Sequence, residues 1–141
     1  MNSYTRLCFA FVCVLALSGC VSRDQADAKL AKACAAGVNV FLTGGQEVDK
    51  IVESKFTPSP VVQGFRHVTL IATVKNDWLE QNHTYDCDFD ESFGFLGGGY
   101  TASIEKLEAE GIVIGRAGGE ILGDAQDFIK LTDAIRKALY E

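Results

Sequence analysis

Residues 83–90, HTYDCDFD, alternate between two kinds of side chain without a break. The odd-numbered positions carry aromatic rings and a thiol, and the even-numbered ones carry a hydroxyl and the carboxylates of Asp86, Asp88 and Asp90. Successive side chains of a strand point to opposite faces, so this period of two predicts a strand over 83–89 with one buried face. The pattern directs Cys87 toward the core and the three carboxylates toward solvent.

More strands are predicted on either side of this one. Residues 65–74 alternate in the same way, with an apolar face that runs from Val68 to Val74. Residues 100–108 and 112–115 follow as two further strands, and short polar turns join the segments. Sequential strands joined by short turns predict an antiparallel meander of about four strands.

A helix is predicted before the meander. Ser22 and Gln25 match a capping box, and Gly37 stands where a helix over 23–36 would end. Its apolar stripe contains Ala26, Leu30, Ala33 and Cys34. This spacing places one helical face, and Cys34 with it, against the core.

Two further segments have helical periodicity. Residues 46–56 predict a second helix, and 124–139 predict a third with Asp124 at its N-cap. The apolar stripes are Val48, Ile51, Val52 and Phe56 in the second helix, and Phe128, Leu131, Ile135 and Leu139 in the third. We therefore predict an α+β fold with two N-terminal helices, an antiparallel meander of about four strands, and one C-terminal helix packed on one sheet face.

Cys34 and Cys87 are predicted to form a disulfide. Two independent periodicities, one of a helix and one of a strand, place both thiols in the core. If the protein is exported, as the N-terminus described next indicates, such a cysteine pair is typical of a disulfide. Two cysteines alone do not make a four-ligand zinc site, and no Cys-x-x-Cys spacing occurs. Closing the loop between them stabilises the fold by about 4 kcal/mol in the chain-entropy model.

The N-terminus is organised like a signal peptide. Arg6 precedes an uncharged run over 7–17, which is shorter than the roughly 20 residues that span a bilayer. The run ends in Leu17-Ser18-Gly19-Cys20, which resembles the lipobox of bacterial lipoprotein precursors. In that family the small side chains before the cysteine let the peptidase reach the backbone, and the thiol carries a diacylglycerol. The alternatives are an ordinary secretory signal with an accidental cysteine and an uncleaved core helix.

The resemblance implies a division of the chain and a location. Residues 1–19 are the signal peptide, 20–22 are the lipidated N-terminus with a short tether, and 23–141 form a single domain. Several acyl chains on Cys20 would hold the protein on a membrane, at about 0.8 kcal/mol per buried methylene. In enteric-type bacteria, a residue other than aspartate after the cysteine directs a lipoprotein to the outer membrane. Because that residue is Val21, the expected location is the outer membrane, facing the periplasm.

The charge of the chain narrows the class of partner. Removal of Arg6 with the signal leaves 12 of the 13 basic residues and all 19 acidic ones, a net charge of −7 with neutral histidines. A surface of this sign repels nucleic acid. The expected partners are therefore the membrane, through the N-terminal lipid, and another envelope protein, with no nucleic acid.

Asp86, Asp88 and Asp90 are candidate contacts for a basic partner. Their spacing also matches the start of an EF-hand calcium loop, but Glu91 and Gly97 stand where that loop needs glycine and glutamate. On a strand the same spacing places three carboxylates on the solvent face. We therefore predict no metal site, and either a solvated face or a partner surface.

Phe93 and Phe95 are the other candidate contacts. They lie in a glycine-rich stretch without the Gly-Lys-Ser/Thr of a phosphate loop, and they either cover the end of the core or form an exposed patch. His67 and His83 come close together if their strands pair. No serine lies in Gly-x-Ser-x-Gly, and no nucleophile with a catalytic context accompanies them. No catalytic residue and no cofactor is predicted.

These features together predict a membrane-anchored envelope lipoprotein with a non-catalytic protein-binding or accessory structural role. An inhibitor or exclusion lipoprotein that meets a basic enzyme or incoming agent is one alternative. A small envelope enzyme is the alternative from another class. An exposed aromatic patch without a deep polar pocket favours a binding protein, whereas titratable groups that converge in a cleft favour an enzyme.

Overall fold

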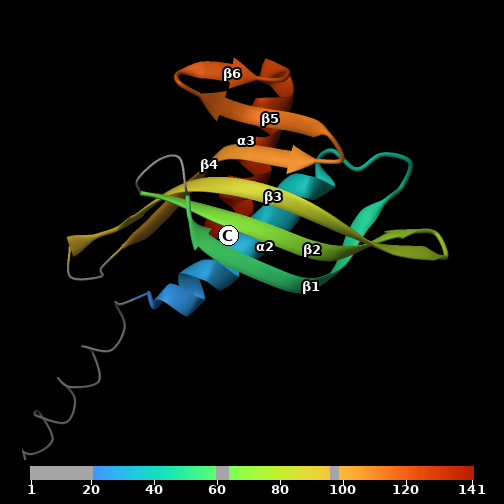
Figure 1. Cartoon of the computed structure of the whole chain (residues 1–141), viewed down its shortest axis with the longest axis horizontal. Helices are drawn as coiled ribbons and strands as arrows, with labels where there is room; N and C mark the ends of the chain where they lie inside the picture. Colours follow the sequence, from blue (N-terminus) through green and yellow to red (C-terminus); the bar gives the residue numbers. More distant parts are fainter. Residues whose placement is uncertain (1–20, 60–63, 96–98) are drawn as a thin grey trace, which may run out of the picture.

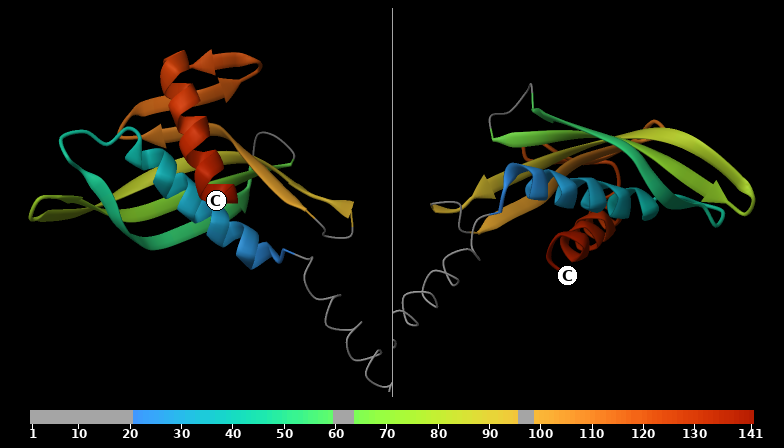
Figure 2. Two further views of the ribbon diagram at one scale, coloured as in Figure 1. Left: turned by 180° about the vertical axis from the view of Figure 1, so that it is seen from behind. Right: turned by 90° about the horizontal axis from the view of Figure 1, so that it is seen from below.

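Two helices and a six-stranded antiparallel sheet make up the described part of the chain, with both helices on one face of the sheet (Figures 1 and 2). The computed structural model describes residues 21–59, 64–95 and 99–141. The elements are α2 (Arg23–Asn39), β1 (Glu47–Pro58), β2 (Phe65–Asn76), β3 (Leu79–Phe93), β4 (Tyr100–Ala109), β5 (Ile112–Ala117), β6 (Glu120–Leu122) and α3 (Ala125–Tyr140).

The strands form a meander in which each strand pairs with the next, in the order β1 to β6. The central pair is long, because β2 and β3 stay in register from Phe65 opposite Asp90 to Asn76 opposite Leu79. Asp77 adopts a left-handed conformation, with φ of 53°, in the tight turn between them. The strand predicted over 83–89 is therefore the middle of a longer strand that lies at the centre of the molecule.

The prediction of two helices before the sheet was wrong, because the predicted second helix is strand β1. Residues of β1 that pair with the buried face of β2 include Val48, Ile51 and Phe56. Two register shifts, between Val48 and Lys50 and between Ile51 and Glu53, insert extra residues into the strand. Each bulge lengthens the interval between inward-facing positions. The apolar residues consequently recur at an interval close to that of a helix.

The predicted number of strands was also wrong. The meander has six strands, because β1 adds to one side and the short β6 adds to the other. A strand of only Glu120–Leu122 is too short to show alternation, so no sequence pattern predicts it.

Helix α2 starts as the sequence predicts but does not end at Gly37. The Ser22 hydroxyl accepts a hydrogen bond from the Gln25 amide at 3.2 Å, and the Gln25 side chain accepts one from the Ser22 amide at 3.0 Å. Gly37 is buried inside the helix, where an added Cβ would lie 2.8 Å from Leu131 Cδ1 of α3. Glycine at this position therefore permits the close approach of the two helices.

The core lies between the helices and one face of the sheet. The predicted Cys34–Cys87 disulfide is confirmed, and it joins α2 to β3 with both residues fully buried. Phe89 and Tyr85 flank Cys87 on the same face of β3 and are the largest fully buried side chains. Asp124 caps α3 as predicted, accepting hydrogen bonds from the Gln126 and Asp127 amides.

Candidate functional site

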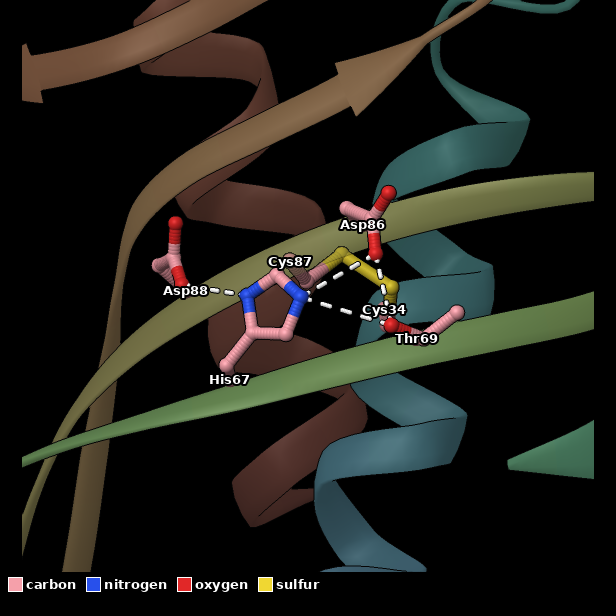
Figure 3. The surroundings of a disulfide bond; sticks show 6 residues. All are labelled: Cys34, His67, Thr69, Asp86, Cys87 and Asp88. Atoms are coloured by element: carbon pink, nitrogen blue, oxygen red, sulfur yellow. Dashed lines mark hydrogen bonds and ion pairs between the residues drawn. A yellow bond between two sulfur atoms is a disulfide. The ribbon is translucent and has the colours of Figure 1, made fainter. Parts of the chain in front are cut away.

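The candidate site lies on the sheet face opposite the helices. Figure 3 places the His67 ring between the carboxylates of Asp86 and Asp88, with the disulfide on the far side of the strands, toward the helices. His67 comes from β2, and both carboxylates come from the neighbouring strand β3. Antiparallel pairing sets His67 directly opposite Asp88, which brings the ring within reach of both carboxylates.

Both ring nitrogens of His67 face acidic oxygens. Nδ1 lies 2.7 Å from Asp88 Oδ1, and Nε2 lies 3.1 Å from Asp86 Oδ1. Thr69 donates its hydroxyl proton to the same Asp86 oxygen at 2.7 Å. The contact between Nδ1 and Asp88 is a hydrogen bond. The histidine and its neighbours therefore form a connected polar network on the strand surface.

A groove of about 610 Å³ runs beside this network across the sheet. Its walls come from the end of β1, the start of β2, the middle of β3, and facing parts of β4 and β5. The lining residues are Thr57, Ser59, Phe65, His67, Asp88, Glu105, Lys106, Arg116, Ala117 and Gly118. Residues from five consecutive strands thus contribute to one concave surface without helical cover.

The charged groups that line the groove lie in opposite-charge pairs. Lys106 Nζ lies 3.4 Å from the second oxygen of Asp88, so this carboxylate contacts both Lys106 and His67. Arg116 on β5 makes a bidentate contact with the Glu105 carboxylate, and this hydrogen bonding raises the pKa of Arg116. Bidentate pairs of this kind fix the relative orientation of the two side chains as well as neutralising their charges.

A β-bulge directs Glu105 into the groove. Asp88 pairs with Lys106, while the next residue of β3, Phe89, pairs with Ile104, so Glu105 is the extra residue of β4. The side chain of Glu105 is nearly buried, and Arg116 neutralises it. Gly115 lets β5 approach this bulge, because an added Cβ would lie within 2.6 Å of the Lys106 Cα. The bulge and Gly115 together bring Glu105 and Arg116 into contact in the groove. Regular strand pairing would not bring these two side chains together there.

The predicted contact residues fall into two separate places. Asp86, Asp88 and Asp90 lie on the helix-free face as the alternation predicts, but Asp86 and Asp88 have the partners described above. Phe93 and Phe95 lie at the end of the β3–β4 hairpin, and neither lines the groove. Cys20 and the lipobox lie outside the described residues. The surface around Asp86 and Asp88 is therefore less negative than the sequence alone indicates.

Sequence reasoning did not identify Glu105, Lys106 or Arg116. A signal for the first two was present, because the apolar positions of this strand change from even numbers, ending at Ile104, to odd numbers, beginning at Leu107. Such a change of parity indicates a bulge. Arg116 had no such signal, because its role depends on the pairing of β5 with β4.

The expected proximity of the two histidines was wrong. Their strands pair, but His67 lies opposite Asp88 whereas His83 lies opposite Ala72, on the helix-covered face. His83 Nδ1 instead lies 3.0 Å from Glu110 Oε1, and the His83 ring stacks on Tyr85. The two rings therefore belong to different surroundings and do not form one site.

Titratable groups do converge in the groove, as an enzyme would require, but their contacts do not favour catalysis. His67 bonds Asp88 at one nitrogen and lies 3.3 Å from the Thr69 hydroxyl at the other. That hydroxyl already donates its single proton to Asp86, and Thr69 does not line the groove. Within the described ranges, no three His, Cys, Asp or Glu side chains lie where they could hold a metal ion.

No protein-family model, curated protein or solved structure matches this chain. No helix in the described part of the chain has the length and apolar character to cross a membrane.

Proposed function

We propose that this protein is a lipid-anchored bacterial envelope lipoprotein that binds another envelope protein through the groove on its helix-free sheet face. The observation that carries the proposal is the groove itself. It holds about 610 Å³ between five strands, and ordered charged pairs line it. The opposite face of the sheet packs against both helices.

The net charge of the chain favours a polypeptide segment with a basic side chain as the occupant of the groove. Phe65 and Thr57 offer apolar contact at one wall, while Asp88 and Glu105 offer carboxylates that a basic group can share with Lys106 and Arg116. The net charge of −7 expected for the mature chain steers basic partners toward the surface and nucleic acid away from it. Fixed polar groups beside an apolar wall are typical of peptide-binding surfaces.

The anchor part of the proposal has a direct test. Cys20→Ser removes the thiol that would carry the diacylglycerol, so incorporation of a palmitate analogue during growth should disappear. Cys8→Ser is the matched control, because that cysteine belongs to the proposed signal peptide and should leave labelling unchanged. Labelling that persists in Cys20→Ser would contradict the lipobox interpretation.

The binding part is tested by photo-crosslinking in intact cells. A photoreactive amino acid replaces Thr57, an exposed residue of the groove, and in a second strain it replaces Ala28, an exposed residue of α2. We expect one discrete adduct from position 57 and none from position 28, with the crosslinked peptide rich in Lys or Arg. Equal adducts from both positions would mean that the groove has no specific partner.

The identity of that adduct separates an accessory role from inhibition. A structural envelope protein in the adduct supports the accessory role, whereas a basic enzyme supports the inhibitor alternative. Both results retain the groove as the binding surface.

A further inference from the structure

Two exposed aromatic rings lie beside the beginning of helix α2. Phe95 is 91% exposed and Phe93 is 40% exposed. Both belong to the end of the β3–β4 hairpin, and all three views in Figures 1 and 2 place this end next to the first turn of α2. Two exposed apolar rings side by side at one end of a hairpin are a candidate contact surface.

A network of hydrogen bonds fastens the hairpin to the helix. Arg23, the first residue of α2, donates to both oxygens of Glu91 on β3, at 2.7 and 2.9 Å. The Tyr100 hydroxyl on β4 donates to the same carboxylate at 3.1 Å. The Arg23 guanidinium also lies over the Phe93 ring, 5.0 Å from its centroid. The hairpin end therefore has a fixed position relative to the residue that follows the tether.

The distance from this position to the proposed lipid is short. Only Val21 and Ser22 lie between Cys20 and Arg23, and the three steps along the chain span about 10 Å at full extension. A lipid on Cys20 therefore brings the start of α2, and the hairpin end fastened to it, to the surface of the bilayer. Aromatic rings are favoured at such an interface.

We propose that Phe93 and Phe95 contact the lipid bilayer beside the anchor and thereby fix the orientation of the domain on the membrane. This inference rests on the lipid anchor of the proposed function. Two of the carboxylates near this end are paired, because Arg23 neutralises Glu91, and Arg23 and Arg66 share Asp27, whereas Asp24 and Asp90 are exposed and limit the contact to lipid without net negative charge. The other end of the long strands then points away from the membrane.

Trp78 provides a natural control for this orientation. It is 97% exposed in the turn between β2 and β3, at the end of the sheet opposite the β3–β4 hairpin. The length of β3 separates the two ends by about 40 Å. It is also the single tryptophan of the chain, so its fluorescence reports one position.

The experiment compares two single-tryptophan forms of the full lipidated protein in vesicles. One is the wild-type chain, and the other carries Trp78→Phe with Phe95→Trp, both at exposed positions that the fold does not depend on. The vesicles are phosphatidylcholine, with or without brominated acyl chains, because Asp24 and Asp90 are exposed at this end and would be repelled by anionic lipid. Flotation of the vesicles first measures whether the protein is anchored.

We expect both forms to float, with bromine reducing the fluorescence of the Phe95→Trp form by about two-fold, since interfacial side chains lie roughly 5–10 Å deep in the headgroup–acyl boundary. The fluorescence of wild-type Trp78 should not change. Flotation without quenching of the Phe95→Trp form, or equal quenching of both forms, would overturn the membrane contact and leave the anchor intact. Failure of both forms to float would remove the anchor, and this inference with it.

Discussion

The two faces of the central sheet consist of the same strands but have different chemistry. On β3, Cys87 and Phe89 face the helices and are fully buried, whereas Asp86 and Asp88 lie on the open face and contact residues of neighbouring strands. The covered face is apolar and is cross-linked to α2 by the disulfide. The open face is polar, connected and concave. The difference indicates that stability is concentrated on the covered face, which leaves the open face available for recognition.

The sharpest test of this difference compares neighbouring residues of β3. Phe89→Ala leaves a cavity in the covered core and should lower the free energy of unfolding by about 3–5 kcal/mol. Asp88→Asn on the open face keeps the shape of the side chain and should cost about 1 kcal/mol. Urea denaturation of the Val21–Glu141 domain measures both values. Similar losses in the free energy of unfolding for the two variants would show that stability is not concentrated on the covered face.

The disulfide is the next largest contribution expected on the covered face. The Cys34→Ala/Cys87→Ala double variant should lose about 2–4 kcal/mol, because the bond closes a long loop in the unfolded chain. The wild-type domain, compared with and without reductant, provides the matched measurement. Alkylation of the denatured, non-reduced protein should detect neither Cys34 nor Cys87 as a free thiol. Equal stability with and without reductant would contradict this contribution.

The Glu105–Arg116 pair tests whether any side-chain contact on the open face contributes to the stability of the fold. Arg116→Met leaves a nearly buried carboxylate without its partner and should cost about 1–3 kcal/mol. Adding Glu105→Gln removes the uncompensated charge and should restore most of that stability. A double variant no more stable than Arg116→Met would mean that the pair is not the cause of the loss.

Two tyrosines are expected to show the smallest difference in stability effect. The Tyr85 hydroxyl is buried with no hydrogen-bond partner among the described residues, and burial raises its pKa to about 12. Tyr85→Phe should therefore leave stability at pH 7 unchanged or increase it by up to about 1 kcal/mol. Tyr100→Phe loses the hydrogen bond to Glu91 and should cost about 1 kcal/mol. Thermal melts of both variants measure these two effects on stability. A greater loss of stability for Tyr85→Phe than for Tyr100→Phe would contradict the prediction.

The raised pKa of Tyr85 also has a pH signature. The folded state retains the phenol proton up to a pH of about 12, whereas the unfolded chain releases it near the ordinary tyrosine pKa of 10.0. Stability from this group is therefore present below pH 10 and falls as pH rises toward 12. Tyr85→Phe should reduce the decline in stability between these two pH values, and an unchanged decline would exclude this contribution.

Local sequence patterns predicted part of this architecture and missed features that depend on register. The disulfide was predictable because one period placed Cys34 inward on a helix and another placed Cys87 inward on a strand. Strand β1 was misread because two bulges spaced Val48, Ile51 and Phe56 like the face of a helix. A bulge changes the period without changing the composition, so propensity and pattern favour the wrong element.

The candidate site was less predictable than the fold for a related reason. The alternation in β3 placed Asp86 and Asp88 on a polar face, but their partners come from β2 and β4. Which residue lies opposite Asp88 depends on the strand register, and a shift of one residue would replace His67 with Arg66 or Val68. Charge patterns along one strand therefore indicate a polar face, and only the pairing reveals which of its charges are neutralised.

The central claim, that the open face binds the partner, is tested most directly by filling the groove. Ala117 is exposed in its wall, so Ala117→Trp should block it, while Ala28→Trp adds the same bulk to the outer side of α2. The measurement is the yield of the position 57 photo-adduct in cells, with the melting temperature of each variant as the check on folding. We predict that Ala117→Trp abolishes the adduct without lowering the melting temperature and that Ala28→Trp retains it. A full adduct yield from Ala117→Trp would contradict the account.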